Sequence, residues 1–486
     1  MAVSFVQRRT KCRRRHRIIL PMVTNRFRAL RRIALSALCA LAVTGCARLP
    51  DSAALIDRHA GQQARFETAL GPLSAQRSAA IVAQLKSRSG DLDMLDKQIA
   101  LEQSISDSPL LLGNKVKLLQ DGAETYPAML AAIRGARNHI NLETYIIEDD
   151  EIGRQFADVL LERQARGVQV NVIYDSIGGI GTPKAFFDRL RAGGIAVLEF
   201  NPVNPFASMT PWLINNRDHR KLLVVDGRIA FIGGINISSV YSGGSVSGLS
   251  AKAGKDQSPW RDTDLQIEGP VVGELQKLFM DTWQKQKGKP LAAKDYFPAL
   301  KAEGNEIVRS IGSTPDDPFS LIYLTLMSAI GNAEKQIYLT NAYFVPDPQF
   351  LKALTDAAAR GVDVKLILPS YSDSALVFHA GRSNYSDLLK GGVQLYERTG
   401  AVLHSKTAVV DGVWSTVGSS NLDWRSFSDN DEVNAVVLGR EFAQQMLAAF
   451  ARDLQAAHAI DPKKWERRPF EFRIKEWASQ LWERLL

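Results

Sequence analysis

The chain has 486 residues, 45% of them hydrophobic, and its formal net charge is +8 at pH 7. This length predicts two or three domains, and the apolar content is enough for a large buried core. Residues 1–46 hold eleven Lys and Arg residues and no acid, so by difference residues 47–486 carry about −3. A basic nucleic-acid-binding surface is therefore not a feature of the overall charge of the main body, although local basic patches stay open, and no nucleic-acid partner is expected.

Residues 1–46 are predicted to be a signal peptide that ends in a lipobox. A basic segment precedes an apolar run that is short for a membrane span, and Val43-Thr44-Gly45-Cys46 resembles the site at which bacterial lipoproteins are lipidated on the cysteine. An uncleaved anchor and a buried helix are the alternatives, and the natural start is either Met1 or, as we favour, Met22. We therefore expect a protein of the bacterial cell envelope, lipid-anchored through Cys46 and facing the periplasm, at the outer or the inner membrane.

Cysteine is confined to this leader, at positions 12, 39 and 46. The rest of the chain therefore has no disulfide, no cysteine-ligated metal and no cysteine nucleophile. Residues 47–113 are polar and rich in Ala, Gln, Arg and Ser. They are predicted to form a helical spacer or cap.

Strands alternate with amphipathic helices from residue 114 onward, which predicts an α/β layer structure. Strands are expected at 115–119, 139–147, 168–174 and after Gly194, and helices at 126–137, 152–166 and 184–192. The same order recurs later, with strands at 335–343 and 362–368 around a helix at 347–360.

Matching phrases show that the body is duplicated. ARGVQVNVIYD at 165–175 corresponds to ARGVDVKLILPS at 359–370, and DTDLQIEG at 262–269 to EVNAVVLG at 432–439. We therefore predict two pseudo-symmetric α/β repeats, 114–290 and 305–457, each a mixed β-sheet flanked by helices, that share one active site at their interface. A Gly/Ser-rich loop, Ser242–Ser258, is inserted in the first repeat.

The chain ends in an amphipathic segment, 461–486, with a helical stripe of apolar residues and several basic residues around it: Ile474, Trp477, Leu481 and Leu485, with Arg467, Arg468, Arg473, Lys475 and Arg484. One interpretation is a helix that lies on a lipid surface, where Trp and basic residues are favoured. The other is a terminal helix packed on the body.

The strongest signal is a motif that occurs once in each repeat. HRKLLVVDGRIAFIGGIN begins at His219 and HSKTAVVDGVWSTVGSSN begins at His404. Each copy has Lys at +2, Asp at +7 and Asn at +17: Lys221, Asp226 and Asn236, then Lys406, Asp411 and Asn421. Apolar runs on both sides of an Asp-Gly pair predict a β-hairpin, and His and Lys share one face of the strand because they are two residues apart.

Two such hairpins in a duplicated body predict one phosphodiester-cleaving site. One imidazole can attack phosphorus while the other carries a proton. Two ammonium groups and two amides can surround the phosphate and offset the charge of the transition state. The resulting phosphohistidine is resolved by an acceptor oxygen. This chemistry needs no cofactor and no metal.

These residues resemble those of the phospholipase D superfamily, whose motif is HxKxxxxD followed by G-[GS]-x-N. The resemblance covers residues 114–457, and the phrases FIGGINIS, NAYFVPD and VGSSNLDWRS are of the type found in bacterial cardiolipin synthases. It implies that His219 is the nucleophile and that His404 is the general acid and base. It also implies that the phosphate is bound by Lys221, Lys406, Asn236 and Asn421.

The resemblance further implies an acid downstream of each hairpin that orients a histidine ring. Asp262 and Glu432 occupy these places, and in chain order they follow His219 and His404. Asp226 and Asp411 complete the catalytic motifs. They sit beside the turns and are expected to brace the hairpins rather than to touch substrate.

The implied function is a phosphatidyltransferase that makes cardiolipin from phosphatidylglycerol at a membrane surface. Water as the acceptor would give a phospholipase D, and a phosphatidylethanolamine acceptor also stays open. Four aromatic residues are expected at the mouth of the site: Trp212, Trp260, Tyr343 and Phe344. A nuclease is disfavoured by the charge, and a non-catalytic envelope scaffold is disfavoured because both motifs are intact.

Overall fold

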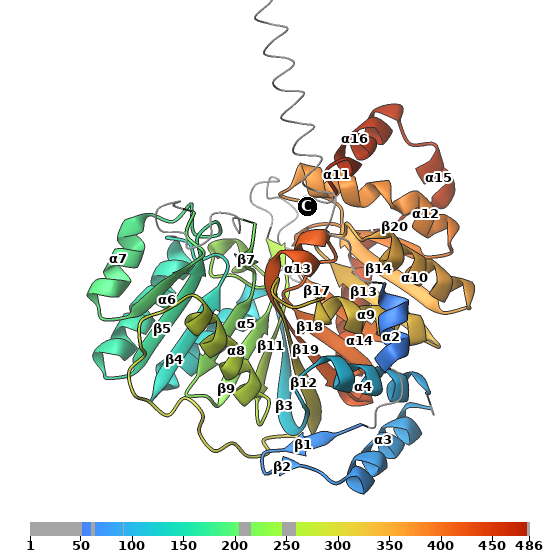
Figure 1. Ribbon diagram of the computed structural model, residues 1–486. Coiled ribbons are helices and arrows are strands. Elements are labelled where there is room, and N and C mark those ends of the chain that lie inside the picture. Colours follow the sequence, from blue (N-terminus) through green and yellow to red (C-terminus); the bar gives the residue numbers. More distant parts are fainter. Residues whose placement is uncertain (1–50, 60–63, 91, 204–214, 245–258, 484–486) are drawn as a thin grey trace, which may run out of the picture. The chain divides into compact units, whose positions relative to one another are not determined.

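The computed structural model describes residues 51–59, 64–90, 92–203, 215–244 and 259–483, which belong to one compact unit (Figure 1). Several of the predicted features lie outside the described residues: the signal peptide with its lipobox and Cys46, residue Trp212, and residues 245–258 of the inserted loop.

The first repeat is a mixed sheet whose strands run in the order β6 (Ala196–Phe200), β5 (Gln169–Asp175), β4 (His139–Thr144), β8 (Lys221–Val225), β9 (Ile229–Gly233), β11 (Thr263–Glu268) and β3 (Leu110–Gln120). The strands β4, β5 and β6 are parallel, and β8 returns antiparallel to β4. The sheet begins four residues before the predicted boundary at 114.

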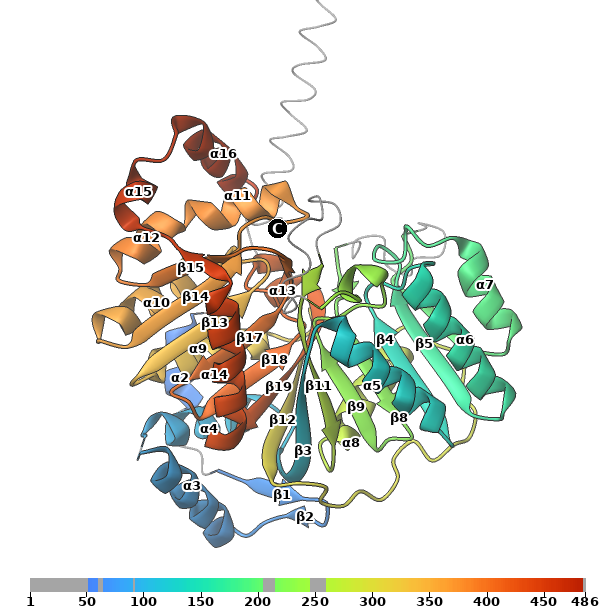
Figure 2. The same cartoon turned by 180° about the vertical axis from the view of Figure 1, so that it is seen from behind.

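The second repeat has the same order: β15 (Gln394–Arg398), β14 (Asp363–Pro369), β13 (Gln336–Asn341), β17 (Lys406–Val410), β18 (Trp414–Gly418), β19 (Asn430–Leu438) and β12 (Glu306–Ser313). Strands β3 and β12 pair antiparallel, so the two sheets form one continuous sheet with the seam between them (Figure 2). The predicted α/β class and the two repeats are confirmed.

Helices cover both faces of each half. In the first repeat α5 (Asp121–Gly135), α6 (Glu151–Ala165) and α7 (Lys184–Ala192) pack on one face and α8 (Val272–Lys285) on the other; in the second, α9 (Leu321–Asn332) and α10 (Pro348–Ala359) oppose α14 (Arg440–Gln455). Strand β8 shows why its sequence is continuously apolar. Leu223 and Val225 face the α5–α7 core, whereas Leu222 and Val224 face the core that contains α8 and α14.

Both predicted hairpins are confirmed. Asp226 and Gly227 have φ of 54° and 62°, and Asp411 and Gly412 have 53° and 64°. A tight turn with positive φ at both central residues matches the twist of the flanking strands, and Asp-Gly adopts it readily. The turns lie at the edge of the sheet opposite to the histidines, which directly precede β8 and β17.

The segment predicted as a helical spacer or cap contains α2 (Ser52–His59), α3 (Ala75–Ser89) and α4 (Met94–Ile105), and also an unpredicted hairpin, β1 (Phe66–Thr68) and β2 (Gly71–Pro72). Strand β1 pairs with β3, and Phe66, Met94 and Ile99 join the core of the second repeat. The described part of this segment is therefore packed against the body.

The C-terminal segment forms two helices rather than one. These are α15 (Pro462–Glu466) and α16 (Phe470–Gln480), and α16 packs on α11 (Ala375–Ser383). Pro469 separates them because proline cannot continue the hydrogen bonding of the preceding turn. Across the ranges that the structure describes, we find no helix with the length and apolarity to cross a bilayer.

Candidate active site

The two motifs meet in one pocket of about 340 Å³ at the seam. It opens at the edge of the sheet where the parallel strands end and where β8 and β17 begin. Both repeats contribute to its lining: Tyr145, Ile146, Arg217, His219, Asn236, Tyr241 and Trp260 from the first, and Tyr343, Asp373, Ser374, Val377, His404, Asn421, Asp423, Arg425 and Asn430 from the second. This agrees with the predicted location of a shared site.

Two short strand pairs cross the seam and decide which groups meet. Strand β7 (Arg217–Asp218) runs parallel to the start of β19, and the His219 N–H donates to the Asp431 carbonyl at 2.9 Å. Likewise β10 (Trp260–Arg261) pairs with β16 (Val402–Leu403), and the His404 N–H donates to the Arg261 carbonyl at 2.8 Å. Each histidine is therefore tied to the residue that precedes the acid of the other repeat.

The acid–histidine pairs are consequently crossed. Glu432 contacts His219, and Asp262 contacts His404. The pairing that chain order indicates, Asp262 with His219 and Glu432 with His404, is wrong. The reason is that the strands β10 and β19 deliver each acid across the seam rather than back to its own hairpin.

In the first pair, His219 Nδ1 lies 3.0 and 3.2 Å from the two Glu432 carboxylate oxygens. The Ser419 hydroxyl also donates to this carboxylate. Burial opposes ionisation of Glu432, but the His219 imidazole, Lys221 and the Ser419 hydroxyl outweigh it and lower its pKa to about 2. Burial lowers the pKa of His219 to about 4, even though Glu432 acts in the opposite direction. At neutral pH this pair is a carboxylate and a neutral imidazole.

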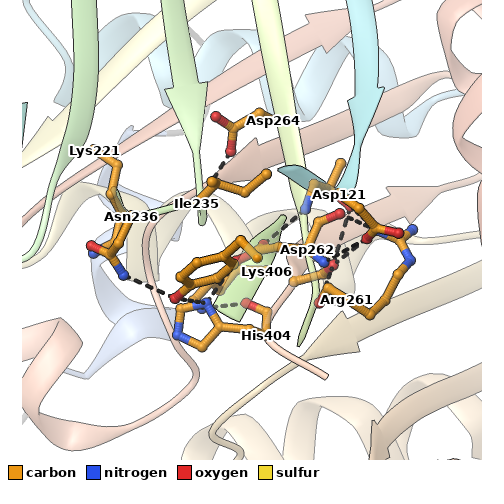
Figure 3. A network of polar contacts seen from close by, with 12 residues as sticks. Asp121, Lys221, Ile235, Asn236, Arg261, Asp262, Asp264, His404 and Lys406 are labelled. Atoms are coloured by element: carbon orange, nitrogen blue, oxygen red, sulfur yellow. Dashed lines mark hydrogen bonds and ion pairs between the residues drawn. The ribbon is translucent and has the colours of Figure 1, made fainter. Parts of the chain in front are cut away.

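In the second pair, His404 Nδ1 lies 2.6 Å from Asp262 Oδ2, and the Thr263 N–H donates to the other carboxylate oxygen at 2.8 Å (Figure 3). Burial raises the pKa of Asp262 to about 6 despite the nearby Lys406. Burial also lowers the pKa of His404, and the neighbouring ammonium groups lower it further. A Cβ at Gly234 would lie 2.2 Å from Asp262 Oδ1, so glycine is required where the second repeat has Ser419.

Both lysines lie behind the histidines and do not line the pocket. Lys221 and Lys406 each donate to the carbonyl of the histidine two residues earlier, and Lys406 Nζ is 2.9 Å from His404 Nδ1. Burial lowers the pKa of Lys221 to about 7 and that of Lys406 to about 8. An anion in the pocket would favour the charged form of both.

The two asparagines line the pocket in different states. Asn236 donates one amide N–H to the Tyr241 hydroxyl at 3.0 Å, and its oxygen accepts the Ile146 N–H at 3.1 Å. Asn421 is buried with its side-chain oxygen unpartnered among the described residues. The unpartnered atom of Asn421 is an acceptor, so it can receive a hydroxyl hydrogen of a substrate.

Asp226 and Asp411 lie away from the pocket, at the turns. Asp226 accepts from three successive backbone N–H groups, those of residues 137–139, at 2.7–3.1 Å, and Asp411 does the same with residues 334–336 at 2.7–2.9 Å. Their inclusion among the catalytic residues is therefore not supported by position. They brace the chain just before β4 and β13, as the sequence analysis expects.

The two walls of the pocket differ in chemistry. Three aromatic rings surround His404, with centroids at 5.0 Å for Trp260, 5.7 Å for Tyr241 and 6.1 Å for Tyr343. The ring of Tyr145 lies 5.1 Å from His219, and two residues of the same lining, Arg217 and Asn430, face each other across β7 and β19. Trp260 and Tyr343 are thus at the site as predicted, whereas Phe344 is in the core of the second repeat.

Sequence reasoning missed Tyr145, Arg217, Tyr241, Asp373 and Arg425. A usable signal existed for Tyr145 and Arg217. The first directly follows strand β4 at the carboxyl edge, and the second is two residues before His219, on the same strand face. We find no group of three or more His, Cys, Asp or Glu side chains that could hold a metal ion in the part of the chain that the structure describes.

A family profile and curated relatives indicate the same family by sequence. The family profile described as "Cardiolipin synthase, PLD-like domain" matches residues 129–241 and 326–454. The chain is 37% identical over 391 residues to a cardiolipin synthase of Geobacillus kaustophilus, covering 80% of this chain and 76% of that one, and 35% identical over 408 residues to a cardiolipin synthase of Alkalihalophilus pseudofirmus, covering 83% and 78%.

Among solved structures, a phosphatidylserine synthase of Haemophilus influenzae Rd KW20 superposes with a TM-score of 0.56 at 14% identity, over 79% of this chain and 99% of that one. At this identity the likeness concerns the fold alone. Together with the paired motifs at one seam pocket, the sequence matches show that the chain belongs to the cardiolipin synthase family of phospholipase D-like proteins.

Proposed function

We propose that this protein is a phosphatidyltransferase that makes cardiolipin from two molecules of phosphatidylglycerol and releases glycerol. The observation that carries the proposal is the pocket itself, in which two histidines from two repeats each have Nδ1 occupied by a carboxylate. This leaves Nε2 of each imidazole as the nitrogen available to substrate. Named relatives that cover most of the chain support the choice of lipid.

In the first step Nε2 of His219 attacks the phosphorus of the donor lipid. The bond from phosphorus to the headgroup glycerol oxygen breaks, and His404 gives that oxygen a proton, so that glycerol leaves. In the second step His404 takes the proton from a hydroxyl of the acceptor lipid. That oxygen attacks phosphorus, the phosphorus–nitrogen bond breaks, and His219 is regenerated.

The electrostatics of the two pairs support this division of roles. A phosphohistidine that keeps its Nδ1 proton carries positive charge on the ring, and the ionised Glu432 beside His219 stabilises that charge. A general acid and base must instead gain and lose a proton. Asp262 suits this role because burial raises its pKa to about 6, close to the working range. The bound phosphodiester raises the pKa of both imidazoles through its negative charge.

The proposal also includes the identity of the lipid that accepts the phosphatidyl group. Cationic and hydrogen-bonding groups, Arg217, Arg425 and Asn430, line the pocket in addition to the motif residues. They favour an acceptor with a phosphate of its own over water or a neutral alcohol, which supports a second phosphatidylglycerol. Hydrolysis to phosphatidic acid is the alternative outcome of the same chemistry.

The location of the protein in the cell is also part of the proposal. A lipid anchor at Cys46 would hold the enzyme at the periplasmic face of a membrane, where its substrates are. We propose this arrangement on the basis of the leader sequence.

The test is a product analysis with the purified full-length chain in mixed micelles. Phosphatidylglycerol labelled in its headgroup glycerol is supplied with and without phosphatidylethanolamine, and the lipids are resolved by mass spectrometry. We expect cardiolipin and labelled free glycerol, both absent with His219→Ala and with His404→Ala. Phosphatidic acid as the sole lipid product would assign a phospholipase, and no product from any phospholipid would return the scaffold hypothesis.

A further inference from the structure

The C-terminal helix α16 is oriented with its polar side toward the protein. Its buried residues are Glu476 and Ser479, and Glu476 accepts from the Arg468 guanidinium at 2.6 Å. Its apolar side faces outward, since Phe470 is 71% exposed, Trp477 64% and Leu481 68%. A surface helix in water normally has the opposite arrangement. The apolar side of α16 is thus built to contact something other than water.

This side belongs to a wider apolar rim. Large exposed hydrophobic residues also follow the carboxyl ends of the parallel strands in both repeats: Ile180 after β5, Val203 after β6, and Leu376 after β14. Val240 joins them, next to the pocket residue Tyr241. All of these lie at the edge of the sheet where the pocket opens, because β4, β5 and β6, and likewise β13 and β14, are parallel.

The opposite edge has few such residues among those described. Leu70 lies in the turn between β1 and β2. Phe297 lies in the segment between the repeats, and its neighbour Pro298 packs against Gly227 of the first Asp-Gly turn. Exposed apolar area is therefore concentrated around the pocket mouth rather than spread over the unit.

The rim is continuous with the pocket. Helix α16 packs on α11, whose N-cap Ser374 and third residue Val377 line the site, and the same helix carries the exposed Leu376. Figure 1 shows α16 lying next to α11. A protein bound across this rim would cover the mouth of the pocket, whereas a lipid surface would deliver substrate to it.

The composition of α16 also fits lipid. Trp477 and Trp482 are the kind of aromatic residues that settle at the headgroup level, and the exposed Arg473 and Lys475 beside them attract anionic headgroups. We propose that the rim formed by Phe470, Ile474, Trp477 and Leu481 of the C-terminal segment, together with Ile180, Val203, Val240 and Leu376, is the face that docks onto an anionic phospholipid surface. The inference rests on the proposed function only in taking the substrate to be a lipid.

The test measures where the tryptophans of α16 lie when the full-length chain is reconstituted in phosphatidylcholine–phosphatidylglycerol vesicles. Lipids brominated along the acyl chain quench only tryptophans that reach the membrane. We expect a quenched component that disappears in Trp477→Phe/Trp482→Phe and falls strongly in Ile474→Ser/Leu481→Ser. Leu70→Ser/Phe297→Ser is the matched control, since it removes the same kind of exposed residues from the opposite edge and should keep the full signal.

Activity provides the second readout. The Ile474→Ser/Leu481→Ser variant should lose about ten-fold in rate on vesicles, equivalent to about 1.4 kcal/mol, and keep its rate on short-chain phosphatidylglycerol dispersed as monomers. Quenching of Trp477 and Trp482 by aqueous acrylamide but not by brominated lipid would overturn the proposal. Protection from both quenchers would also overturn it, because a second copy or another protein would then cover the face. Lipid quenching in a chain without any lipid activity would keep this surface and reject the proposed function instead.

Discussion

The two acid–histidine pairs have nearly the same backbone and different chemistry. Around His219 the acid is Glu432, supported by the Ser419 hydroxyl, and its pKa is lowered to about 2. Around His404 the acid is Asp262, packed against Gly234, and burial raises its pKa to about 6. Duplication thus supplies two equivalent positions, and the different groups around the two carboxyls make them unequal. In the proposed mechanism this inequality serves the two roles, since one histidine holds a charge while the other exchanges a proton.

The largest effect is expected from removing either imidazole. His219→Ala and His404→Ala should each lower turnover by about 10⁴-fold or more. They should differ in the covalent intermediate: with lipid labelled at phosphorus, acid-labile label should still attach slowly to the protein in His404→Ala and never in His219→Ala. Rapid-quench labelling followed by peptide mapping checks this. Label on His404 in the parent enzyme would reverse the assigned roles.

The second test separates the two acids by their pH dependence. Glu432→Gln and Asp262→Asn should each cost about 100-fold near pH 7, as expected when the group that orients a reacting imidazole is lost. The parent rate should fall as the pH drops below about 6, because Asp262 then becomes protonated. This limb should disappear in Asp262→Asn and persist in Glu432→Gln, whose parent carboxyl titrates only near 2. Equal profiles for the two variants would show that the pairs are equivalent.

The third test concerns the buried lysines. Because burial lowers the pKa of Lys406 to about 8, its ammonium group is lost as the pH rises through that value, and an anion in the pocket then binds less tightly. We expect the affinity for tungstate, measured by calorimetry, to fall by up to about ten-fold per pH unit between pH 8 and 9. Lys406→Arg should flatten this dependence, since arginine stays charged. An unchanged slope in the variant would exclude Lys406 as its source.

The smallest effect on chemistry is expected at the turns. Asp226→Asn and Asp411→Asn each weaken a carboxylate that accepts from three backbone N–H groups, which should lower the free energy of unfolding by about 1–3 kcal/mol. The rate per folded molecule should stay nearly constant. Thermal unfolding and an active-site count of the folded fraction check this. A loss of turnover without a loss of stability would return these residues to the catalytic set.

Local patterns predicted much of the fold. The helix at 184–192 occurs with the predicted bounds, and the strands and helices of both repeats lie within a few residues of their predicted positions. The alternation of strands and helices, the apolar runs and the Asp-Gly turns depend on residues that are neighbours in the chain, so the sequence predicts them. The hairpin β1–β2 escapes prediction because its strands are only three and two residues long. The apolar stripe of the C-terminal segment predicts one helix and does not show the break at Pro469.

By itself, the sequence determined the duplication, the paired motifs and therefore the choice of the groups proposed to react, because these depend on residue type and spacing alone. Only the tertiary structure decided the crossed pairing of Glu432 with His219 and of Asp262 with His404. That pairing is made by β7 on β19 and by β10 on β16, between segments that are far apart in the chain. The tertiary structure also decided that α16 turns its polar side inward, because periodicity defines an apolar face without saying what the face will meet.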